Sequence, residues 1–348
     1  MLPVKHAAKK TILVFTFALD VEHPIFAHQA YLIDRLAKSF KKVIVITNQV
    51  GIYRKKRNVD IYDLNWQEKR PIRNTLVFRK RLKHVLSNEE VDITFSHMTT
   101  VLSLLSGLFL KKRKISHILW YAHAKNSLIL KFTSKLVDRI LTSTTGSFPF
   151  PTRKLTVIGQ GIDTNQFFYR GKKENKFSKF FHVGRIDESK NIHGIIKFFL
   201  NIPKKNKKLY LIGSPSGNKK STLYHNQLKN NYINNKNIIF VGSLPRSELY
   251  GVINKFDCFL HMYQGSLDKT LVEATIIGIP VITANSEYIR EFGSWAKDNE
   301  SNYIEQYKFV TSMKISKLNS ILKSKSLIAK KNHSFEVWYK KLLKTLIH

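Results

Sequence analysis

The 348-residue sequence lacks several features that would assign a protein class directly. Its single cysteine, Cys258, excludes an internal disulfide and suits a reducing compartment such as the cytosol. Its longest apolar stretches, Thr11–Leu19 and Val101–Leu110, are too short to cross a bilayer, which takes about 20 residues, so we expect a soluble or peripheral protein. Cys-x-x-Cys, His-Glu-x-x-His, Gly-x-Ser-x-Gly and Gly-Lys-Ser/Thr patterns are missing, so nothing supports a metal centre, a serine hydrolase or a Walker phosphate loop.

Acidic residues are also scarce. The 24 Asp and Glu stand against 59 Lys and Arg, which gives a formal net charge of +35. Such a surplus fits nucleic acid, an anionic membrane surface, or a Lys- and Asn-rich composition without a single partner. Because no aromatic residues are arrayed between the basic runs for base stacking, we predict no nucleic-acid partner and keep the other two interpretations.

Short apolar runs alternate with amphipathic segments along the whole chain. Ile12–Phe17, Val43–Thr47 and Ile115–Tyr121 are such runs in the first half, and Phe180–Gly184 and Cys258–Met262 are examples in the second. Apolar strands separated by helices are typical of parallel sheets covered on both faces. We therefore predict an α/β protein with two Rossmann-like, doubly wound domains that face each other across a cleft.

The domain boundaries follow from composition. We expect an N-terminal domain over residues 1–168, a basic and polar linker over 169–178, and a C-terminal domain over 179–330. Residues 331–348 have the apolar spacing of a last amphipathic helix. Ligands of doubly wound domains bind at the carboxyl ends of strands, so the side chains that follow each strand are the candidates for function.

Two cations follow the first strand of the C-terminal half. Gly184 ends this strand, and Arg185 and Lys190 lie in the loop before the next helix. Glycine lets the backbone approach a ligand closely, and an arginine fork with a lysine point charge suits a diphosphate. The competing interpretation is a pair of solvated surface cations in a very basic protein.

A second stretch, Gly265–Ile282, has a Gly-Ser turn, a helix that begins near Asp268 and a stop at Gly278. The free N–H groups at the start of this helix favour an anion. Glu273 lies about a turn and a half inside the helix among apolar residues, where a carboxylate is costly unless it is paired. The two hydroxyls of a ribose would pair with it, and a partly exposed position on the wet side of the helix is the alternative.

These stretches resemble motifs of the GT-B glycosyltransferases of family 4. Gly184–Lys190 resembles the diphosphate grip of that family, and Glu273–Ile282 resembles its Glu-Ala-x-x-x-Gly-x-Pro-Val-Ile signature, whose Glu binds the ribose. Gly161–Phe167 and Ile239–Ser243 resemble its domain junction and the segment that meets the base. The resemblance implies a retaining enzyme with a nucleotide-sugar as substrate, without a cofactor or metal, and a last helix that crosses back to the N-terminal domain.

One position departs from the family pattern. The family usually carries another Glu eight residues before the ribose Glu, and here Gly265 takes that place, followed by Ser266-Leu267-Asp268. Asp268 and Lys269 flank the same helix start and are the candidates to replace it. The Gly-Ser-x-Asp-Lys variant resembles one found in a subset of bacterial members. Because of this departure, the sequence does not identify the donor sugar. An inactive chain that still binds the donor is a further alternative.

In the first half, His123 follows the strand Ile115–Tyr121, and the resemblance implies that it contacts the 6-position of the donor sugar. A capping or surface histidine is the alternative. Asp20, His28 and His97 also follow strands, so we expect them on the acceptor side by position.

Taken together, the resemblance implies a hexosyltransferase that passes a sugar to a glycan or lipid-linked glycan in cell-surface polysaccharide synthesis. We expect it in the cytoplasm or peripherally on the inner face of the cytoplasmic membrane. The predicted catalytic residues are His123, Arg185, Lys190 and Asp268. The predicted donor-binding residues are Gly184, Arg185, Lys190, Ser243, Leu244, Gly265, Ser266, Lys269, Thr270, Leu271 and Glu273. A sugar-nucleotide epimerase of the same architecture and a non-catalytic basic binding protein are the alternatives.

Overall fold

The computed structural model describes residues 6–23, 25–296 and 302–347. The chain forms two compact units. Unit 1 comprises Met1–Ile158 with Tyr339–His348, and unit 2 comprises Gly159–Trp338. Unit 2 thus begins before residue 168, where composition placed the domain boundary.

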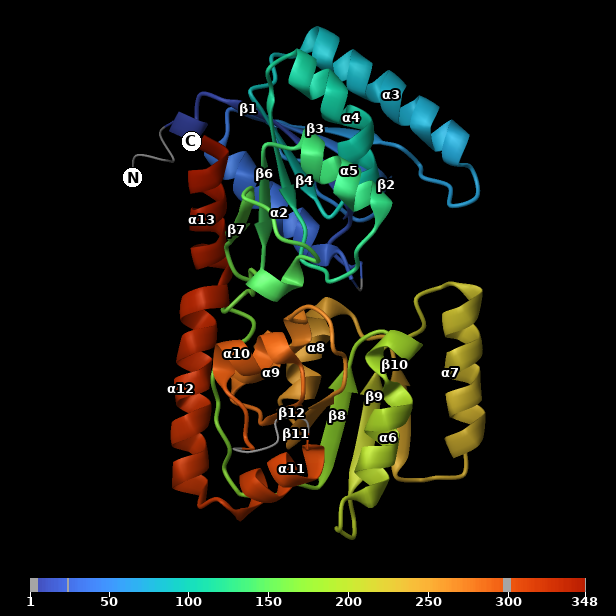
Figure 1. Ribbon diagram of the computed structural model, residues 1–348, viewed down its shortest axis with the longest axis vertical. Helices are drawn as coiled ribbons and strands as arrows, with labels where there is room; N and C mark the ends of the chain where they lie inside the picture. The colour runs from blue at the N-terminus through green and yellow to red at the C-terminus, as the bar shows by residue number, and fades with distance from the viewer. Residues whose placement is uncertain (1–5, 24, 297–301, 348) are drawn as a thin grey trace. The chain divides into compact units, whose positions relative to one another are not determined.

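Unit 1 is built on a seven-stranded sheet in the order β3-β2-β1-β4-β5-β6-β7 (Figure 1). Its strands are β1 (Thr11–Leu19), β2 (Lys42–Val50), β3 (Val59–Asp63), β4 (Ile93–His97), β5 (Ser116–Trp120), β6 (Arg139–Thr142) and β7 (Leu155–Val157). Each strand pairs with its neighbours in parallel. The apolar side chains of β1 are buried, in keeping with a sheet that has helices on both faces.

The helices of unit 1 connect these strands. They are α2 (Ala27–Ser39), α3 (Pro71–Asn88), α4 (Thr100–Lys112) and α5 (Leu128–Leu136), with a short η1 (Thr145–Ser147). The step from β1 to β2 runs one way across the sheet, and the steps from β3 through β6 run the other way. Because parallel crossovers are right-handed, α2 covers one face and α3, α4 and α5 cover the other (Figure 1).

Unit 2 has a five-stranded parallel sheet in the order β10-β9-β8-β11-β12. The strands are β8 (Lys179–Val183), β9 (Lys208–Ile212), β10 (Ile238–Gly242), β11 (Cys258–His261) and β12 (Val281–Thr283). The helices are η2 (Glu188–Lys190), α6 (Ile192–Asn201), α7 (Lys219–Tyr232), α8 (Arg246–Ile253), α9 (Lys269–Ile277), α10 (Ser286–Phe292), α11 (Tyr303–Ser312) and α12 (Ile315–His333). The prediction of two Rossmann-like α/β domains is therefore confirmed.

The two faces of the unit 2 sheet carry separate cores because side chains alternate along a strand. Phe180 of β8 packs on one side with Phe199 of α6, and the next residue, Phe181, packs on the other with Phe259 and Leu271. All four phenylalanines are at most 1% exposed. This double burial explains why the strands of unit 2 appear in the sequence as continuous apolar runs.

The segment 169–178, expected as a linker, is bonded into unit 2. The backbone N–H of Arg170 donates to the carbonyl of Ile277 over 2.9 Å. The side chain of Asn319 bonds both the N–H and the carbonyl of Lys172, each over 2.8 Å. Its polar residues therefore bond to α9 and α12 of the same unit.

Helix α13 (Phe335–Ile347) ends the chain, and its residues from Tyr339 onward belong to unit 1. The hydroxyl of Tyr339 donates to the carbonyl of Arg35 over 2.8 Å and lies 2.7 Å from the hydroxyl of Ser39. These bonds fasten α13 to α2 at Tyr339.

Candidate active site

The parallel strands of unit 2 bring several predicted residues to one edge of the sheet. Gly184–Lys190 follow β8, Ser243 and Leu244 follow β10, and Gly265–Glu273 follow β11 or lie in α9. These residues follow β8, β10 and β11, three strands of the same parallel sheet, at or beyond the carboxyl ends. This is the edge at which doubly wound domains bind ligands.

Lys190 is a buried and fixed cation. Its Nζ lies 2.5 Å from Oδ2 of Asp268 and 3.7 Å from the centroid of the Tyr263 ring. The residue is only 6% exposed. The alternative of a solvated surface lysine is therefore excluded, and the positive charge is held in one place before any ligand arrives.

His261 bonds the same carboxylate from the end of β11. Its Nε2 lies 3.0 Å from Oδ2 of Asp268, and its Nδ1 lies 3.1 Å from Oγ1 of Thr283. Burial lowers the pKa of His261, so the ring is neutral and donates through Nε2 to Asp268 while Nδ1 accepts from the threonine hydroxyl. Burial acts to raise the pKa of Asp268, but Lys190 and His261 hold that pKa well below its usual range.

The carboxylate of Asp268 therefore bonds neighbouring side chains and does not cap the helix that follows it. It occupies the N-cap position of α9, yet its side chain makes no capping hydrogen bond because the carboxylate is committed to Lys190 and His261. An N-terminus without a side-chain cap suits an anionic ligand. Asp268, predicted as a catalytic residue and as a candidate to replace the missing glutamate, is placed here where it also positions Lys190.

Glu273 is fully buried in α9 and paired with an arginine. Nη1 of Arg246 lies 3.1 Å from Oε2 of Glu273, and Nη2 contacts Oε1, which makes the pair bidentate. Burial acts to lower the pKa of Arg246, and the charge of Glu273 more than offsets it. The partly exposed alternative for Glu273 is excluded, and a carboxylate with about four acceptor sites still has capacity for a ribose diol.

Sequence reasoning missed Arg246. The residue begins α8 directly after the loop that follows β10, and its guanidinium lies 4.8 Å from the centroid of the Phe167 ring. Its position directly after the loop that follows a strand could have identified it as a site residue. Because the chain has 59 Lys and Arg, one arginine in such a place did not stand out.

Two further cations stand at this edge. The side chain of Arg185 is 42% exposed and its Nη1 lies 3.5 Å from Oδ2 of Asp187, so it is free to reorient toward a ligand. Lys269 begins α9, and burial together with the charge of Arg246 lowers its pKa to about 8. Arg185 thus has only a long, solvent-exposed pair with Asp187, whereas Lys190 is held closely by Asp268.

The loop before α9 is tight at Gly265, the position at which the resembled motif has a glutamate. A Cβ atom added to Gly265 would lie 1.9 Å from the hydroxyl oxygen of Tyr263. No side chain fits at this position unless Tyr263 moves. Tyr263, which stacks on Lys190, therefore occupies the space that a glutamate would need.

Three other residues predicted to bind the donor are buried or bonded within the loops of this edge. Leu271 is fully buried, and its N–H donates to the carbonyl of Asp268 over 3.2 Å, so it supports the first turn of α9. Ser266 is also buried, while Ser243 bonds the hydroxyl of Ser214 over 2.6 Å. Ser243 thus ties the loops after β9 and β10 together.

Of the predicted residues of unit 1, Asp20 and His123 follow strands, whereas His97 is the last residue of β4 and His28 lies in the first turn of α2. His97 ends β4, is 4% exposed, and its Nδ1 lies 2.9 Å from Nε2 of Gln29. Its ring centroid lies 5.2 Å from that of His28. Asp20 accepts a 2.9 Å bond from the N–H of Glu22 in the loop after β1.

His123 follows β5 on the next loop along the chain. Its Nδ1 accepts a 2.9 Å hydrogen bond from the N–H of Lys125, which fixes the ring within its own turn. Unit 1 therefore brings His28 and His97 into contact, and it places Asp20 and His123 on the loops that follow β1 and β5.

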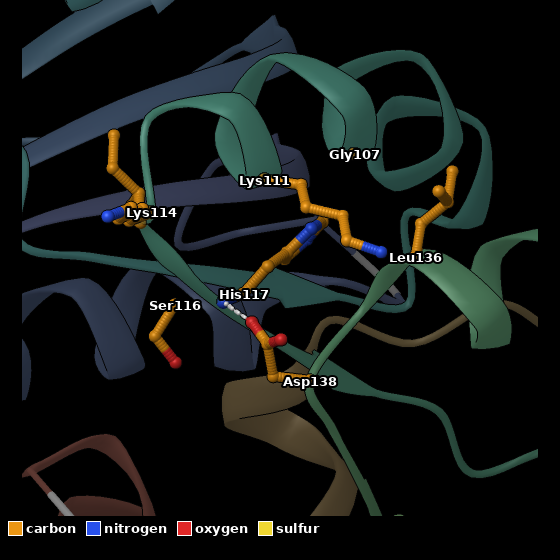
Figure 2. Close-up of a pocket in the computed structure, with 8 residues that line it drawn as sticks. Gly107, Lys111, Lys114, Ser116, His117, Leu136 and Asp138 are labelled. Atoms are coloured by element: carbon orange, nitrogen blue, oxygen red, sulfur yellow. Dashed lines mark hydrogen bonds between the residues drawn. The ribbon is translucent and has the colours of Figure 1, made fainter.

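A cavity of about 230 Å³ in unit 1 lies away from these residues (Figure 2). It is lined by Gly107, Lys111, Lys114, Ile115, Ser116, His117, Leu136 and Asp138. Ser116 begins β5 and Asp138 precedes β6, so the cavity is at the amino ends of the strands. Burial lowers the pKa of His117 to about 3, so its ring is neutral, and we assign no chemistry to this cavity.

The described residues contain neither a candidate metal centre nor a candidate membrane-spanning helix. In 6–23, 25–296 and 302–347, no group of three or more His, Cys, Asp or Glu is placed to hold a metal ion. No helix in those ranges has the length and hydropathy that crossing a membrane requires.

Comparison with known proteins gives a family for the second half of the chain. Residues 163–333 match the family described as Glycosyl transferases group 1. No curated protein matches the sequence.

Solved structures match over nearly the whole length. The structure of Anabaena Alr3699/HepE in complex with UDP and glucose has a TM-score of 0.72 and 13% identity, covering 96% of this chain and 98% of that one. Sucrose-phosphate synthase from Thermosynechococcus elongatus has a TM-score of 0.75 and 12% identity, covering 97% and 98%. WaaG, a glycosyltransferase involved in lipopolysaccharide biosynthesis, has a TM-score of 0.68 and 12% identity, covering 96% and 99%.

At such low identities the structural matches establish the fold, which is the predicted GT-B fold. The family match over residues 163–333 covers the edge of unit 2 described above, including the loop after β8 and all of α9. The family match and the fold together show that this chain is an enzyme of the glycosyltransferase class.

Proposed function

We propose that the chain is a retaining hexosyltransferase that uses a nucleoside diphosphate sugar as donor. The acceptor is a hydroxyl of a glycan or lipid-linked glycan, in cell-surface polysaccharide synthesis in the cytoplasm at an anionic membrane. The observation that carries the proposal is the arrangement of Arg185, Lys190 and Lys269 beside the uncapped start of α9 and the buried Glu273. Because HepE was solved with UDP and with UDP-glucose, a uridine diphosphate donor is the first to test.

The three cations suit the charge that develops on the leaving diphosphate. Lys190 is held by Asp268 and Tyr263, so little reorganisation is needed when the bond to the sugar breaks. Arg185 is exposed and offers a planar fork to two phosphate oxygens. A preorganised donor of this kind contributes about 100- to 1000-fold to turnover, which lets the reaction run without a metal.

The nucleoside is held deeper in unit 2. Glu273 is bonded by Arg246 and has acceptor sites left for the two ribose hydroxyls. Lys269 precedes it in the same helix, so a ribose on Glu273 sets the diphosphate over the start of α9. In the retaining reaction we propose, the acceptor hydroxyl attacks the face that the diphosphate leaves, and a phosphate oxygen takes the proton.

Turnover of an Arg185→Ala variant tests the proposal. We expect kcat with a UDP-sugar and a glycan acceptor to fall about 100-fold or more. The melting temperature should stay unchanged, because the side chain is 42% exposed and its pair with Asp187 is long. Lys255→Ala is the matched control, since Lys255 is exposed and lies before β11, at the other end of the strands. Equal kcat in Arg185→Ala and wild type would refute the assignment.

The same assay separates the epimerase alternative. An epimerase interconverts the donor without an acceptor, whereas a transferase needs the acceptor to form a new glycosidic bond. The match to the glycosyl transferases group 1 family favours the transferase. Chromatography of a reaction that lacks acceptor should show no epimerised sugar nucleotide.

A further inference from the structure

Helices α3, α4 and α5 cover one face of the unit 1 sheet and expose an unusual number of large apolar side chains. The exposed fractions run from 38% for Val101 to 77% for Ile72. The set consists of Ile72, Leu76, Val101, Leu108, Phe109, Leu128, Ile129 and Phe132. Single exposed apolar residues are ordinary, but a group on neighbouring helices marks an interaction surface.

The spacing of these residues aligns them along each helix. Ile72 and Leu76 are four residues apart in α3, Val101 and Leu108 are seven apart in α4, and Leu128 and Phe132 are four apart in α5. Each pair therefore lies on one side of its helix. We call the exposed residues of these three helices the α3–α5 surface.

Contacts between the helices make this surface continuous. Helix α4 packs against both α3 and α5, and the three run over the same side of the sheet (Figure 1). The guanidinium of Arg79 in α3 lies 5.8 Å from the ring centroid of Phe109 in α4. In α5, Nζ of Lys135 lies 5.8 Å from the ring centroid of Phe132, so cations border the apolar side chains directly.

The charge on the α3–α5 surface has one sign. The sequences of the three helices contain no aspartate or glutamate. Their basic residues are Arg73, Arg79, Lys80, Arg81, Lys83, Lys111, Lys112, Lys131 and Lys135. The chain continues after α4 with Arg113 and Lys114, which extend the positive run.

Exposed apolar side chains among cations match one kind of partner. A bilayer with anionic lipids offers negative headgroups at its surface and hydrocarbon just beneath them. An acidic protein surface without apolar side chains would satisfy the cations, but it would leave Leu128 and Ile72 without an apolar partner. We propose that the α3–α5 surface docks this enzyme on an anionic lipid bilayer, with Leu128, Ile129 and Phe132 entering the headgroup layer.

This inference names the surface through which the proposed enzyme reaches its membrane. The α3–α5 surface consists of residues of unit 1 alone, whereas the proposed donor site consists of residues of unit 2. An experiment can therefore refute one of these proposals without refuting the other. Lipid binding measured without donor or acceptor therefore tests the surface and leaves the proposed reaction untouched.

Co-sedimentation of the full chain with vesicles is the test. We expect binding to vesicles of equal parts phosphatidylglycerol and phosphatidylcholine, at least tenfold weaker binding to phosphatidylcholine alone, and weaker binding at 0.5 M salt. Leu128→Asp/Phe132→Asp should weaken binding at least tenfold. Lys131→Ala and Lys135→Ala should each weaken it about fivefold.

Leu223→Asp/Ile233→Asp is the matched control, because Leu223 and Ile233 are 53% and 75% exposed but lie in or beside α7 of unit 2. It should bind vesicles like wild type. UDP binding and the melting temperature report that each variant is folded, and Leu128 and Phe132 are exposed enough to be changed without loss of the core.

Three results would overturn the proposal. One is no binding of the wild type to the anionic vesicles, and another is equal loss of binding in the control and the α5 variant. The third is a wild-type dimer that Leu128→Asp/Phe132→Asp dissolves, with no vesicle binding, because a second copy of the chain would then cover the surface.

Discussion

Replacing Asp268 by asparagine tests whether a buried carboxylate holds Lys190 in place. Asparagine keeps the size of the side chain and one acceptor oxygen but removes the charge. Lys190 is then a cation at 6% exposure with the Tyr263 ring as its remaining close contact among those described. Removing one partner of a buried pair costs about 3–5 kcal/mol, and we take about 3 kcal/mol because the side chain of Asp268 is 22% exposed.

This loss is large enough to see by thermal denaturation. A change of 1 kcal/mol shifts the melting temperature by about 2–4 °C in a unit of this size, so we expect Asp268→Asn to lower that of unit 2 by about 6–12 °C. UDP affinity, measured by calorimetry below the transition, should also fall because Lys190 is no longer held beside the site. Asp187→Asn is the control, because Asp187 pairs with the exposed Arg185 and its loss should cost less than about 1 kcal/mol.

A double-mutant cycle isolates the pair itself. If Lys190 and Asp268 act together, Lys190→Met/Asp268→Asn should lose much less stability than the sum of the two single variants, by at least about 1 kcal/mol. Additive losses, or an Asp268→Asn variant with wild-type stability and UDP affinity, would refute the idea that this carboxylate holds the lysine.

The other predictions concern the deeper part of the site. Arg246→Ala should destabilise unit 2 by about 3–5 kcal/mol in urea denaturation, because Glu273 then lies buried without its partner. Lys220→Ala, which breaks an exposed pair, should leave the denaturation midpoint close to that of the wild type. Lys269 has a pKa of about 8, so it is charged at pH 7 and loses its proton as the pH rises toward 9. UDP affinity should therefore fall between pH 7 and pH 9 in the wild type. Lys269→Met should bind UDP more weakly at pH 7, and its affinity should depend less on pH. If the affinity of the variant falls as steeply with pH as that of the wild type, the titrating group is not Lys269.

The two-domain α/β fold could be predicted from the sequence because a strand that is buried on both faces of a sheet appears as a continuous apolar run. Phe180 and Phe181 belong to different cores, so both must be apolar, and Phe180–Gly184 was recognisable as a strand for that reason. The domain boundary was less accessible. The polar segment 169–178 resembles a linker in composition, and only its bonds to α9 and α12 show that it belongs to unit 2.

The sequence predicted individual residues of the candidate site, but it did not predict which of their side chains pair with one another. Arg185, Lys190 and Glu273 each follow a strand or lie in the helix after one, which sequence spacing reveals. The pair of Lys190 with Asp268 joins residues 78 positions apart, which no local pattern encodes. The pair of Glu273 with Arg246 was hidden in the same way.

Gly265 shows a third limit of sequence reasoning. Its departure from the family pattern was visible, but its cause was not. In the folded loop the ring of Tyr263, which also stacks on Lys190, lies where a side chain at Gly265 would stand. A steric substitution of this kind becomes apparent only when the loop is folded.

The most direct test of the central claim is a thermal-shift screen of the full chain with UDP-, GDP- and ADP-sugars, without acceptor. At a donor concentration of 100 times Kd, binding stabilises the folded state by about 2.7 kcal/mol, which corresponds to a rise of about 5–10 °C for unit 2. We expect one nucleotide class to give this rise in the wild type and in Lys255→Ala, and a much smaller rise in Arg185→Ala. No shift with any of the three classes would contradict the account of this edge of unit 2 as a nucleotide-sugar site.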